Sequence, residues 1–345
     1  MDLQQKTRRF GAAVILCALC LRLWEAGMPG KILEFLSQPN TAQFLIYLET
    51  GRHVRFSASK DTFSPFFRES PAPSPGFPTI SEENPLFPTI SEETPLFPSF
   101  SPEEAELVQI YNTSGKKYDL SALLTRPLTW NLRQEAPTVL ILHTHTTESY
   151  TKNGENYQET SLYRTLDEEY NMLCIGQTVA QLLENAGITV IHDRTLHDYP
   201  SYNGSYVHAR GSISTILEEN PTISLVLDLH RDASGGNGGQ LRTEVDIGGK
   251  TSAQMMFVMG TNHTAWEENL ALAAKLQVLL EKQAPGIMRP INLRGQRFNQ
   301  DLSPGALLVE MGAAGNTRAE ALLAARQLAQ AIITLSEGTT VGEGH

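Results

Sequence analysis

The sequence predicts an α/β domain whose mostly parallel sheet is covered by helices on both faces, preceded by an N-terminal membrane anchor and a proline-rich linker. Two observations indicate this fold class: short apolar runs alternate with helical periods from about residue 104 onward, and nine of the 19 prolines fall within residues 71–102. With 345 residues, 41% of them hydrophobic, the chain can form one full-size core with extensions. We divide it into residues 1–30, 31–70, 71–103 and 104–345.

The first 30 residues are interpreted as a membrane anchor. Lys6, Arg8 and Arg9 precede an apolar run from Phe10 to Leu21. No small-residue cleavage site of the usual form follows, so we expect an uncleaved, single-pass anchor rather than a removed signal peptide. Because basic residues mark the cytoplasmic side, the N-terminus should lie in the cytoplasm and the rest of the chain outside the cell membrane.

Residues 71–103 are expected to form an extended spacer. The unit FPTISEENPL begins at Phe77, returns at Phe87 as FPTISEETPL and is degenerate from Phe97. Proline at this density removes backbone donors and favours a polyproline-like conformation. Within residues 31–70, between anchor and spacer, the stretch from Lys31 to Lys60 is apolar enough for a short membrane-proximal helix or a partner-contact surface.

Five buried strands are expected after residue 104, because five runs are short and rich in β-branched residues or leucine. They are Thr138–Leu142, Ile188–His192, Ile223–His230, Met255–Met259 and Ala306–Met311. Helices are expected between and after them: Met172–Ala186 with Gly187 as C-cap, Tyr206–Glu219, Trp266–Gln283, and Thr317–Leu335, where Thr317 and Glu320 have capping-box spacing.

Composition argues against two classes of function. The net charge is −11 and no lysine or arginine cluster lies beyond the N-terminal segment, so nucleic acid is not expected as a partner. Cys17 and Cys20 lie in the N-terminal apolar run and Cys174 stands alone, which excludes a disulfide framework or a multi-cysteine zinc site. A metal would have to be held by histidine and carboxylate.

Three histidines are expected at one edge of the sheet. His143 and His145 directly follow one expected strand, and His230 ends another. The carboxyl ends of parallel strands form one edge, where the sites of such sheets lie. Strand alternation would place His143 and His145 on one face, so either could be a metal ligand with the other supporting it.

Carboxylates accompany these histidines. Glu148 stands three residues after His145, although Glu159 in the same loop is an alternative, and Asp228 is placed two residues before His230 to orient that imidazole. Two imidazoles and one carboxylate, without thiolate, suit Zn²⁺ with an open coordination position. We therefore predict His145, Glu148 and His230 as zinc ligands.

Glu310 is predicted to be the catalytic base. It is the one charged residue in the apolar strand ALLVEM, and a lone buried carboxylate is costly unless it is paired or used. Beside a zinc-activated water it would accept a proton and pass it to the leaving amine, which amounts to amide hydrolysis. The alternative is a structural ion pair with Arg289, Arg294 or Arg297.

Several long motifs resemble the stage II sporulation protein P family. The resemblance covers most of residues 105–338 and is carried by HTHTTESY, YRTLDEEYN, HDYPSYNGSY, LDLHRDA and FNQDLSPGALLVEMGAAGNTRAEA. ALLVEMGAAGN and LDLHRDA also look like the catalytic-glutamate and second-histidine segments of zinc-dependent N-acetylmuramoyl-L-alanine amidases. Transferred by position, this gives His145 and His230 as ligands and Glu310 as base, whereas Glu148 follows His145 sooner than the ligand glutamate does in the amidase pattern.

The resemblance implies a fold like that of the zinc amidases and a membrane-anchored peptidoglycan hydrolase. The implied reaction is cleavage of the N-acetylmuramoyl-L-alanine amide bond, together with an ability to cut peptide cross-links, during septal wall remodelling and engulfment. Stage II sporulation proteins D and M are the implied partners. Two other functions stay open: a zinc endopeptidase of stem peptides, and a catalytically silent scaffold that binds glycan.

Overall fold

The structure is a computed structural model that describes residues 100–128, 131–151, 163–233 and 241–337. The expected anchor, the segment 31–70 and nearly all of the spacer lie outside these residues. Within the described ranges, no helix combines the length and hydropathy needed to cross a membrane.

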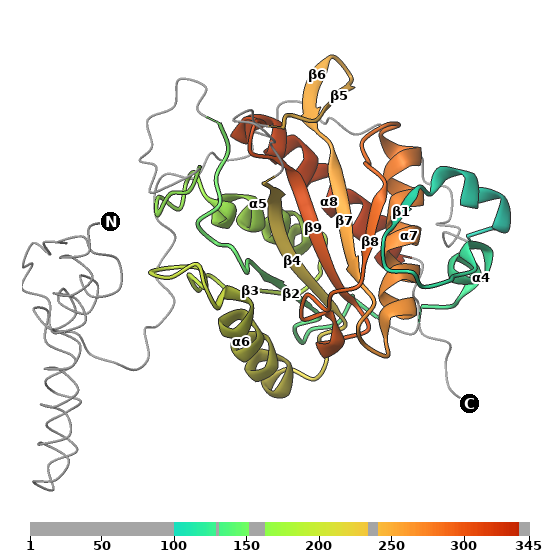
Figure 1. The fold of residues 1–345 in the computed structure, drawn as a ribbon, viewed down its shortest axis with the longest axis horizontal. Coiled ribbons are helices and arrows are strands. Elements are labelled where there is room, and N and C mark those ends of the chain that lie inside the picture. Colours follow the sequence, from blue (N-terminus) through green and yellow to red (C-terminus); the bar gives the residue numbers. More distant parts are fainter. Residues whose placement is uncertain (1–99, 129–130, 152–162, 234–240, 338–345) are drawn as a thin grey trace, which may run out of the picture. The chain divides into compact units, whose positions relative to one another are not determined.

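A seven-stranded sheet forms the centre of the domain (Figure 1), in the order β1-β8-β7-β9-β4-β2-β3. Five of its neighbouring pairs are parallel, and among the described strands β7 with β9 is the one antiparallel pair in it. The mostly parallel sheet is thus confirmed. Its strands are β1 (Ile110–Asn112), β2 (Val139–Leu142), β3 (Val190–His192), β4 (Leu225–Asp232), β7 (Met255–Gly260), β8 (Ile291–Arg294) and β9 (Ala306–Ala313).

All five expected strands are present, but four further strands were not expected. β1 and β8 pair with each other at one side of the sheet, and their sequences IYN and INLR are too short and too polar to stand out as buried strands. The other two, β5 (Glu244–Ile247) and β6 (Lys250–Ala253), form a separate hairpin. Gly248 and Gly249 connect them with φ of 58° and 82°, the backbone that a tight hairpin turn requires.

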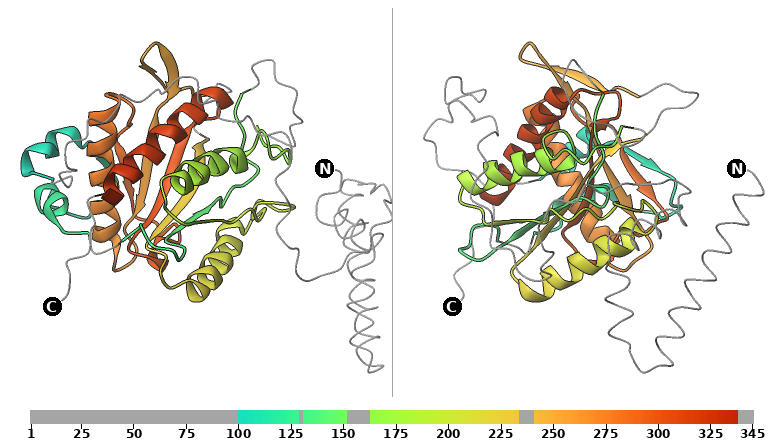
Figure 2. Two further views of the ribbon diagram at one scale, coloured as in Figure 1. Left: turned by 180° about the vertical axis from the view of Figure 1, so that it is seen from behind. Right: turned by 90° about the vertical axis from the view of Figure 1, so that its left-hand side faces the viewer.

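Helices cover the two faces of the sheet unequally. Helices α5 (Met172–Asn185), α7 (Trp266–Gln283) and α8 (Arg318–Glu337) lie on one face, and α6 (Ser205–Glu219) lies on the other (Figure 2). Shorter helices, η1 (Pro102–Leu107) and α4 (Leu120–Thr125), pack against α7, and η3 (Gln300–Leu302) precedes β9.

The expected helix ends are also found. Gly187 follows α5 with φ of 80°, as a glycine just beyond a helix end should. Before α8, the backbone N–H of Thr317 donates to Glu320 Oε2 at 3.1 Å, and the backbone N–H of Glu320 donates to Thr317 Oγ1 at 3.3 Å. These two reciprocal bonds are the predicted capping box.

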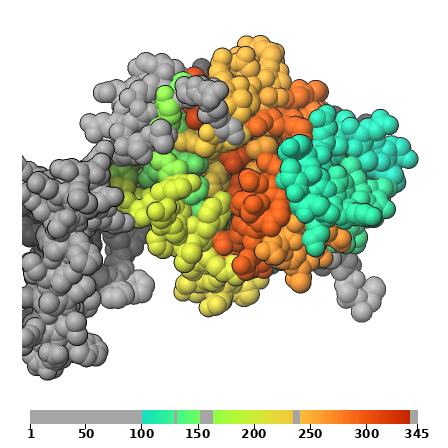
Figure 3. All heavy atoms as spheres, viewed as in Figure 1, coloured from blue at the N-terminus to red at the C-terminus, as the bar shows by residue number. Residues whose placement is uncertain are grey.

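The single helix on the second face leaves part of the sheet open. Ala209 and Ile213 of α6 pack on the β2 and β4 side of the sheet. Beyond the helix, Met256, Val258 and Leu308 form a separate small cluster on β7 and β9 against which Phe298 packs. Figure 3 shows this face, with orange and red residues at the surface between yellow α6 and teal residues 100–128. These apolar residues line the same pocket as His230 and Glu310.

Close backbone packing at the start of β9 gives the first testable prediction. A Cβ atom on Gly305 would lie 1.8 Å from the carbonyl oxygen of Ser224, which is a backbone atom beside β4. We therefore expect Gly305→Ala to lower the free energy of unfolding by about 3 kcal/mol in urea denaturation.

Gly211 provides the matched control for this substitution. It lies within α6, and a Cβ there would have nothing within 4 Å. Gly211→Ala should therefore gain roughly 0.5–1 kcal/mol from helix propensity. Equal stabilities for the two variants would contradict the close approach at Gly305.

Candidate active site

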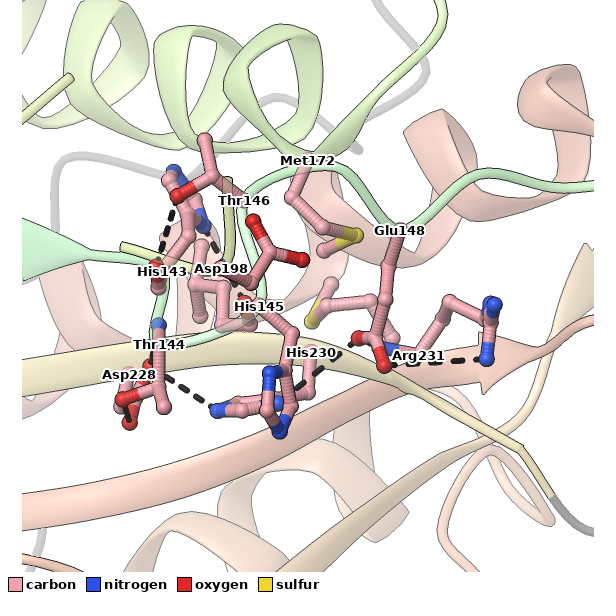
Figure 4. A network of polar contacts seen from close by, with 12 residues as sticks. His143, Thr144, His145, Thr146, Glu148, Met172, Asp198, Asp228, His230 and Arg231 are labelled. Carbon is pink, nitrogen blue, oxygen red and sulfur yellow. Dashed lines mark hydrogen bonds and ion pairs between the residues drawn. The ribbon is translucent and has the colours of Figure 1, made fainter. Parts of the chain in front are cut away.

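The turn after β2, residues 143–148, is held by hydrogen bonds from its threonines to two buried carboxylates (Figure 4). The backbone N–H and the hydroxyl of Thr144 donate to Asp228 at 2.8 and 2.6 Å. The backbone N–H and the hydroxyl of Thr147 donate to Asp198 at 3.1 and 2.7 Å. The sequence HTHTTE thus folds into a fixed turn at the carboxyl end of the strand, because its side chains bond to neighbouring elements.

His145 from this turn and His230 from β4 come together at the carboxyl edge of the sheet. Their ring centroids are 5.2 Å apart and their planes are nearly perpendicular, at 86°. Glu310 on β9 stands directly beside His230 in the strand register. His145 Nδ1 and Glu310 Oε2 are buried and have no hydrogen-bond partner among the described residues. Buried polar atoms are normally hydrogen-bonded, so two such atoms at one edge indicate a binding site.

Glu148 is buried beside His230 and is surrounded by positive charge. Its Oε2 lies 3.7 Å from His230 Nδ1 and accepts a hydrogen bond from the backbone N–H of Arg231 at 3.2 Å. The guanidinium groups of Arg231 and Arg164 each lie 3.7 Å from its Oε1. These cations offset the cost of burying the carboxylate.

Asp228 lies against the other nitrogen of His230. Its Oδ1 is 2.9 Å from His230 Nε2, an ion-pair distance whose angle falls outside hydrogen-bond geometry. Burial alone would lower the pKa of His230, but the negative charges of Asp228, Glu148 and Glu310 raise it to about 9. Burial alone would raise the pKa of Asp228, but His230 and the hydrogen bonds from Thr144 lower it to about 2.

In the metal-free protein, we expect Asp228→Asn to lower the pKa of His230, because it removes the nearest negative charge while Glu148 and Glu310 remain. The pKa of about 9 in the folded state exceeds the usual value of histidine. The stabilisation by this contact is therefore complete below about pH 6.5 and is lost as the pH rises through about 9. The imidazole titration by NMR and urea denaturation between about pH 6 and 10 would measure both effects.

The control for that experiment is Asp193→Asn. Asp193 lies 3.2 Å from His197 and also accepts hydrogen bonds from Thr195. Among the described residues it has no ion pair with His230, so this variant should leave the titration of His230 unchanged. An unchanged His230 titration in Asp228→Asn itself would contradict the prediction.

Glu310 has the electrostatic character of a proton-transfer group. Burial raises its pKa to about 8; the positive charge of His230 opposes this rise, and Glu148 and Asp232 add to it. A carboxylate with a raised pKa is a stronger base at the pH where enzymes work.

The arginines considered as structural partners for this carboxylate are placed elsewhere. Arg289 lies 2.8 Å from Asp232, and Arg297 lies 3.6 Å from Asp301. Arg294 has no carboxylate within ion-pair distance in the described parts of the chain, and its guanidinium lies over an aromatic ring. The structure therefore shows no arginine pairing of Glu310 among the residues that it describes.

His143 points away from the pocket. Its Nδ1 donates to the carbonyl of Leu229 at 3.1 Å, and its Nε2 lies 2.9 Å from His192 Nε2. Burial lowers the pKa of His143 to about 4. The expectation that His143 and His145 share one face is wrong, because β2 ends at Leu142 and the alternation of a strand does not continue into the turn.

The edge that carries His145, His230 and Glu310 opens into a pocket of about 550 Å³. Aromatic residues that the sequence reasoning did not single out form one wall. The ring of Tyr202 stacks on His145 at 4.6 Å with its hydroxyl 3.3 Å from His145 Nε2, and Tyr206 lies parallel to His230 at 6.4 Å. The tyrosine-rich motif HDYPSYNGSY was the available signal for this wall.

The ligand set stays a prediction. Within the described residues, no three histidine, cysteine, aspartate or glutamate side chains are gathered closely enough to hold a metal ion as they stand. His145, Glu148 and His230 do lie at one end of the pocket. Glu159, the alternative to Glu148, lies outside the described residues.

Comparisons with known proteins bear on the family of the chain. A curated relative, the stage II sporulation protein P of Bacillus subtilis (strain 168), is 31% identical over 202 residues, which are 55% of this chain and 49% of that protein. The chain thus spans about half the length of that relative.

Two solved structures align with 58% of this chain over 94% of theirs, each with a TM-score of 0.34. They are an N-acetylmuramoyl-L-alanine amidase from Clostridium difficile 630, at 17% identity, and the CwlD amidase from Clostridioides difficile in complex with the GerS lipoprotein, at 13%. The family model described as Stage II sporulation protein P (SpoIIP) matches residues 88–333. The chain therefore belongs to the stage II sporulation protein P family.

Proposed function

We propose that the protein is a zinc-dependent peptidoglycan hydrolase that cleaves the amide bond between N-acetylmuramic acid and L-alanine. One observation carries this proposal: His145 and Glu310, each with a buried polar atom that has no hydrogen-bond partner among the described residues, line one pocket together with His230 and Glu148. Membership of the stage II sporulation protein P family supports a role in sporulation. The choice of peptidoglycan and of this bond follows from the motif resemblance given above.

One pair of donor atoms at this site has a spacing close to that of zinc ligands. Ligands at about 2.0–2.2 Å in a tetrahedral arrangement lie roughly 3.4 Å from each other. The 3.7 Å between His230 Nδ1 and Glu148 Oε2 is close to that spacing and too long for a hydrogen bond. Asp228 beside the other nitrogen of His230 is the carboxylate support that ligand histidines commonly have. His145, Glu148 and His230 would hold the ion.

Zinc, when bound, supplies Lewis acidity toward the amide carbonyl and the attacking water. Glu310 accepts the proton of that water at its unpartnered carboxylate oxygen and then donates it to the leaving nitrogen of the alanine. Asp228 holds the orientation of His230, and Arg231 and Arg164 hold the negative charge of Glu148 in place.

The setting of this reaction is part of the same proposal. An anchor within residues 1–30 would hold the domain at the outer side of the cell membrane, and the proline-rich spacer would set its reach toward the wall. Stage II sporulation proteins D and M are the proposed partners on the strength of the resemblance.

Digestion of purified peptidoglycan by the full chain with zinc, followed by mass spectrometry, tests the proposal. Free lactyl groups on muramic acid together with new alanine amines would support the amidase activity. New amines within stem peptides, with the lactyl link intact, would instead identify an endopeptidase. Binding to the wall without any cleavage product, with partners supplied, would identify a scaffold.

A further inference from the structure

The pocket extends well beyond the catalytic edge. Its lining runs from His230 and Glu310 across Met256, Val258 and Leu308 to Arg294 at the far end. The three apolar residues belong to the half of the sheet face that α6 leaves uncovered. The pocket is therefore a groove along the sheet, with the proposed chemistry at one end.

The far end of the groove carries a cation. Three arginines line the groove, and two of them neighbour carboxylates: Arg231 lies 3.7 Å from Glu148, and Arg289 lies 2.8 Å from Asp232. Arg294 is exposed and has no carboxylate within ion-pair distance in the described parts of the chain. It therefore keeps its hydrogen-bond donors available for an anion from outside.

The backbone around this cation is fixed. The guanidinium of Arg294 lies 5.8 Å from the ring of Phe298, which itself has a left-handed φ of 52°. A Cβ on Gly260 would lie 2.5 Å from the carbonyl oxygen of Gln296, so this loop passes tightly over the end of β7. The side chain of Gln300 holds this loop against β7. It accepts a hydrogen bond from the N–H of Gly260 and donates one to the carbonyl oxygen of Val258, each at 2.8 Å. A held backbone of this kind pre-organises a binding group.

The register of the strands sets the distance between the two ends. Glu310 pairs with Met256 on β7, and Arg294 pairs with Gly260 four residues further along the same strand. With a rise of about 3.3 Å per residue and strands about 4.8 Å apart, the Cα atoms of Glu310 and Arg294 are roughly 16 Å apart. An extended peptide of three residues spans about 10 Å, and the two side chains reach across the remainder.

We propose that Arg294 binds a carboxylate in the peptide part of the substrate, and that the groove floor of Met256, Val258 and Leu308 receives the stem between this carboxylate and the cleaved amide. This inference rests on the proposed function and specifies the substrate of that site. The glycan offers no suitable anion, because the carboxyl group of muramic acid is consumed in the amide that is cleaved. The peptide does offer one, at its second or third residue, and a guanidinium binds carboxylate with paired hydrogen bonds.

Binding measurements on uncleaved substrate test this without depending on turnover. The full chain carrying Glu310→Gln would be titrated in a calorimeter with a synthetic muramyl tripeptide that has free carboxyl groups. Parallel titrations would use the same compound amidated at the second residue, at the third residue, or at both. Adding Arg294→Gln should weaken binding of the free acid about 10- to 100-fold and leave binding of the doubly amidated compound unchanged.

The four titrations distinguish a carboxylate at the second residue of the stem from one at the third. They also separate the binding role of Arg294 from the proposed hydrolase function. If amidation at one residue abolishes the effect of Arg294→Gln on affinity, the carboxylate at that residue is the one that Arg294 binds. Arg294→Lys should restore part of the affinity, and Arg297→Gln, which removes an arginine paired with Asp301 outside the groove, should change nothing.

Equal loss for all four compounds, no loss for the free acid, or no binding of any compound would each overturn the assignment of Arg294. Failure of the chain without substitutions to cleave peptidoglycan would overturn the proposed function and leave this binding result standing.

Discussion

Replacing Glu310 by glutamine should reduce hydrolysis of peptidoglycan about a thousandfold or more while zinc stays bound at the level of the unsubstituted chain. Glutamine keeps the shape of the side chain and loses the ability to accept a proton. Glu310 lies beside His230 in the strand register but is not among the proposed ligands, so the metal site should survive. The rate of product release by mass spectrometry and the zinc content by elemental analysis measure the two outcomes separately.

Glu244→Gln is the matched control for this variant. Glu244 lies on the β5–β6 hairpin, pairs with Arg242 at 2.9 Å and does not line the pocket. The same chemical change there should leave activity and zinc content unaltered. Undiminished hydrolysis by Glu310→Gln would remove this residue from the mechanism.

Alanine at His145 or at His230 should remove zinc almost completely and abolish hydrolysis. Each substitution takes away one of two imidazoles whose ring centroids are 5.2 Å apart, and a site left with two protein ligands binds zinc weakly. Elemental analysis of the dialysed full chain measures the loss. Stoichiometric zinc in either variant would show that the ligand set is wrong.

Two other histidines make this experiment specific. His208→Ala removes an exposed imidazole on α6 that lies outside the pocket, and it should keep full zinc content. His143→Ala should also keep zinc, since both ring nitrogens of His143 are engaged with Leu229 and His192. Thermal unfolding of each variant separates loss of the metal from loss of the fold. Loss of zinc in a well-folded His143→Ala protein would restore His143 as a ligand candidate.

The sequence predicted the apolar strands of the large sheet, including the edge strand β3, and failed for the short strands β1 and β8, which contain polar residues. Runs such as VLIL of β2 and LVLDLH of β4 are recognisable because a central parallel strand is apolar on both sides. β1 is the last strand on one side of the sheet and pairs with β8, and β8 pairs in turn with β7. Because these strands form through pairing with residues distant in sequence, the local pattern of apolar and polar residues does not indicate them.

The candidate site was predictable where a residue sits on or next to a strand. His230 and Glu310 fall on neighbouring strands, so the rule of the carboxyl edge places them together. The orientations of His143 and His145 depend on a turn whose shape is set by bonds to Asp228 and Asp198, residues distant in sequence. Such contacts, like the stacking of Tyr202 on His145, arise only in the folded chain.

The antiparallel pairing of β7 with β9, the one such pairing among the described strands of the large sheet, divides the loops of the domain between two ends of the sheet. Because β7 and β8 run opposite to β9 and β4, the loop that follows β8 and carries Phe298 leaves the sheet at the opposite end from the loops that follow β4 and β9. Under the proposed function, exchanging residues 295–299 should therefore change the surroundings of Arg294 and leave in place the strands that carry His230 and Glu310.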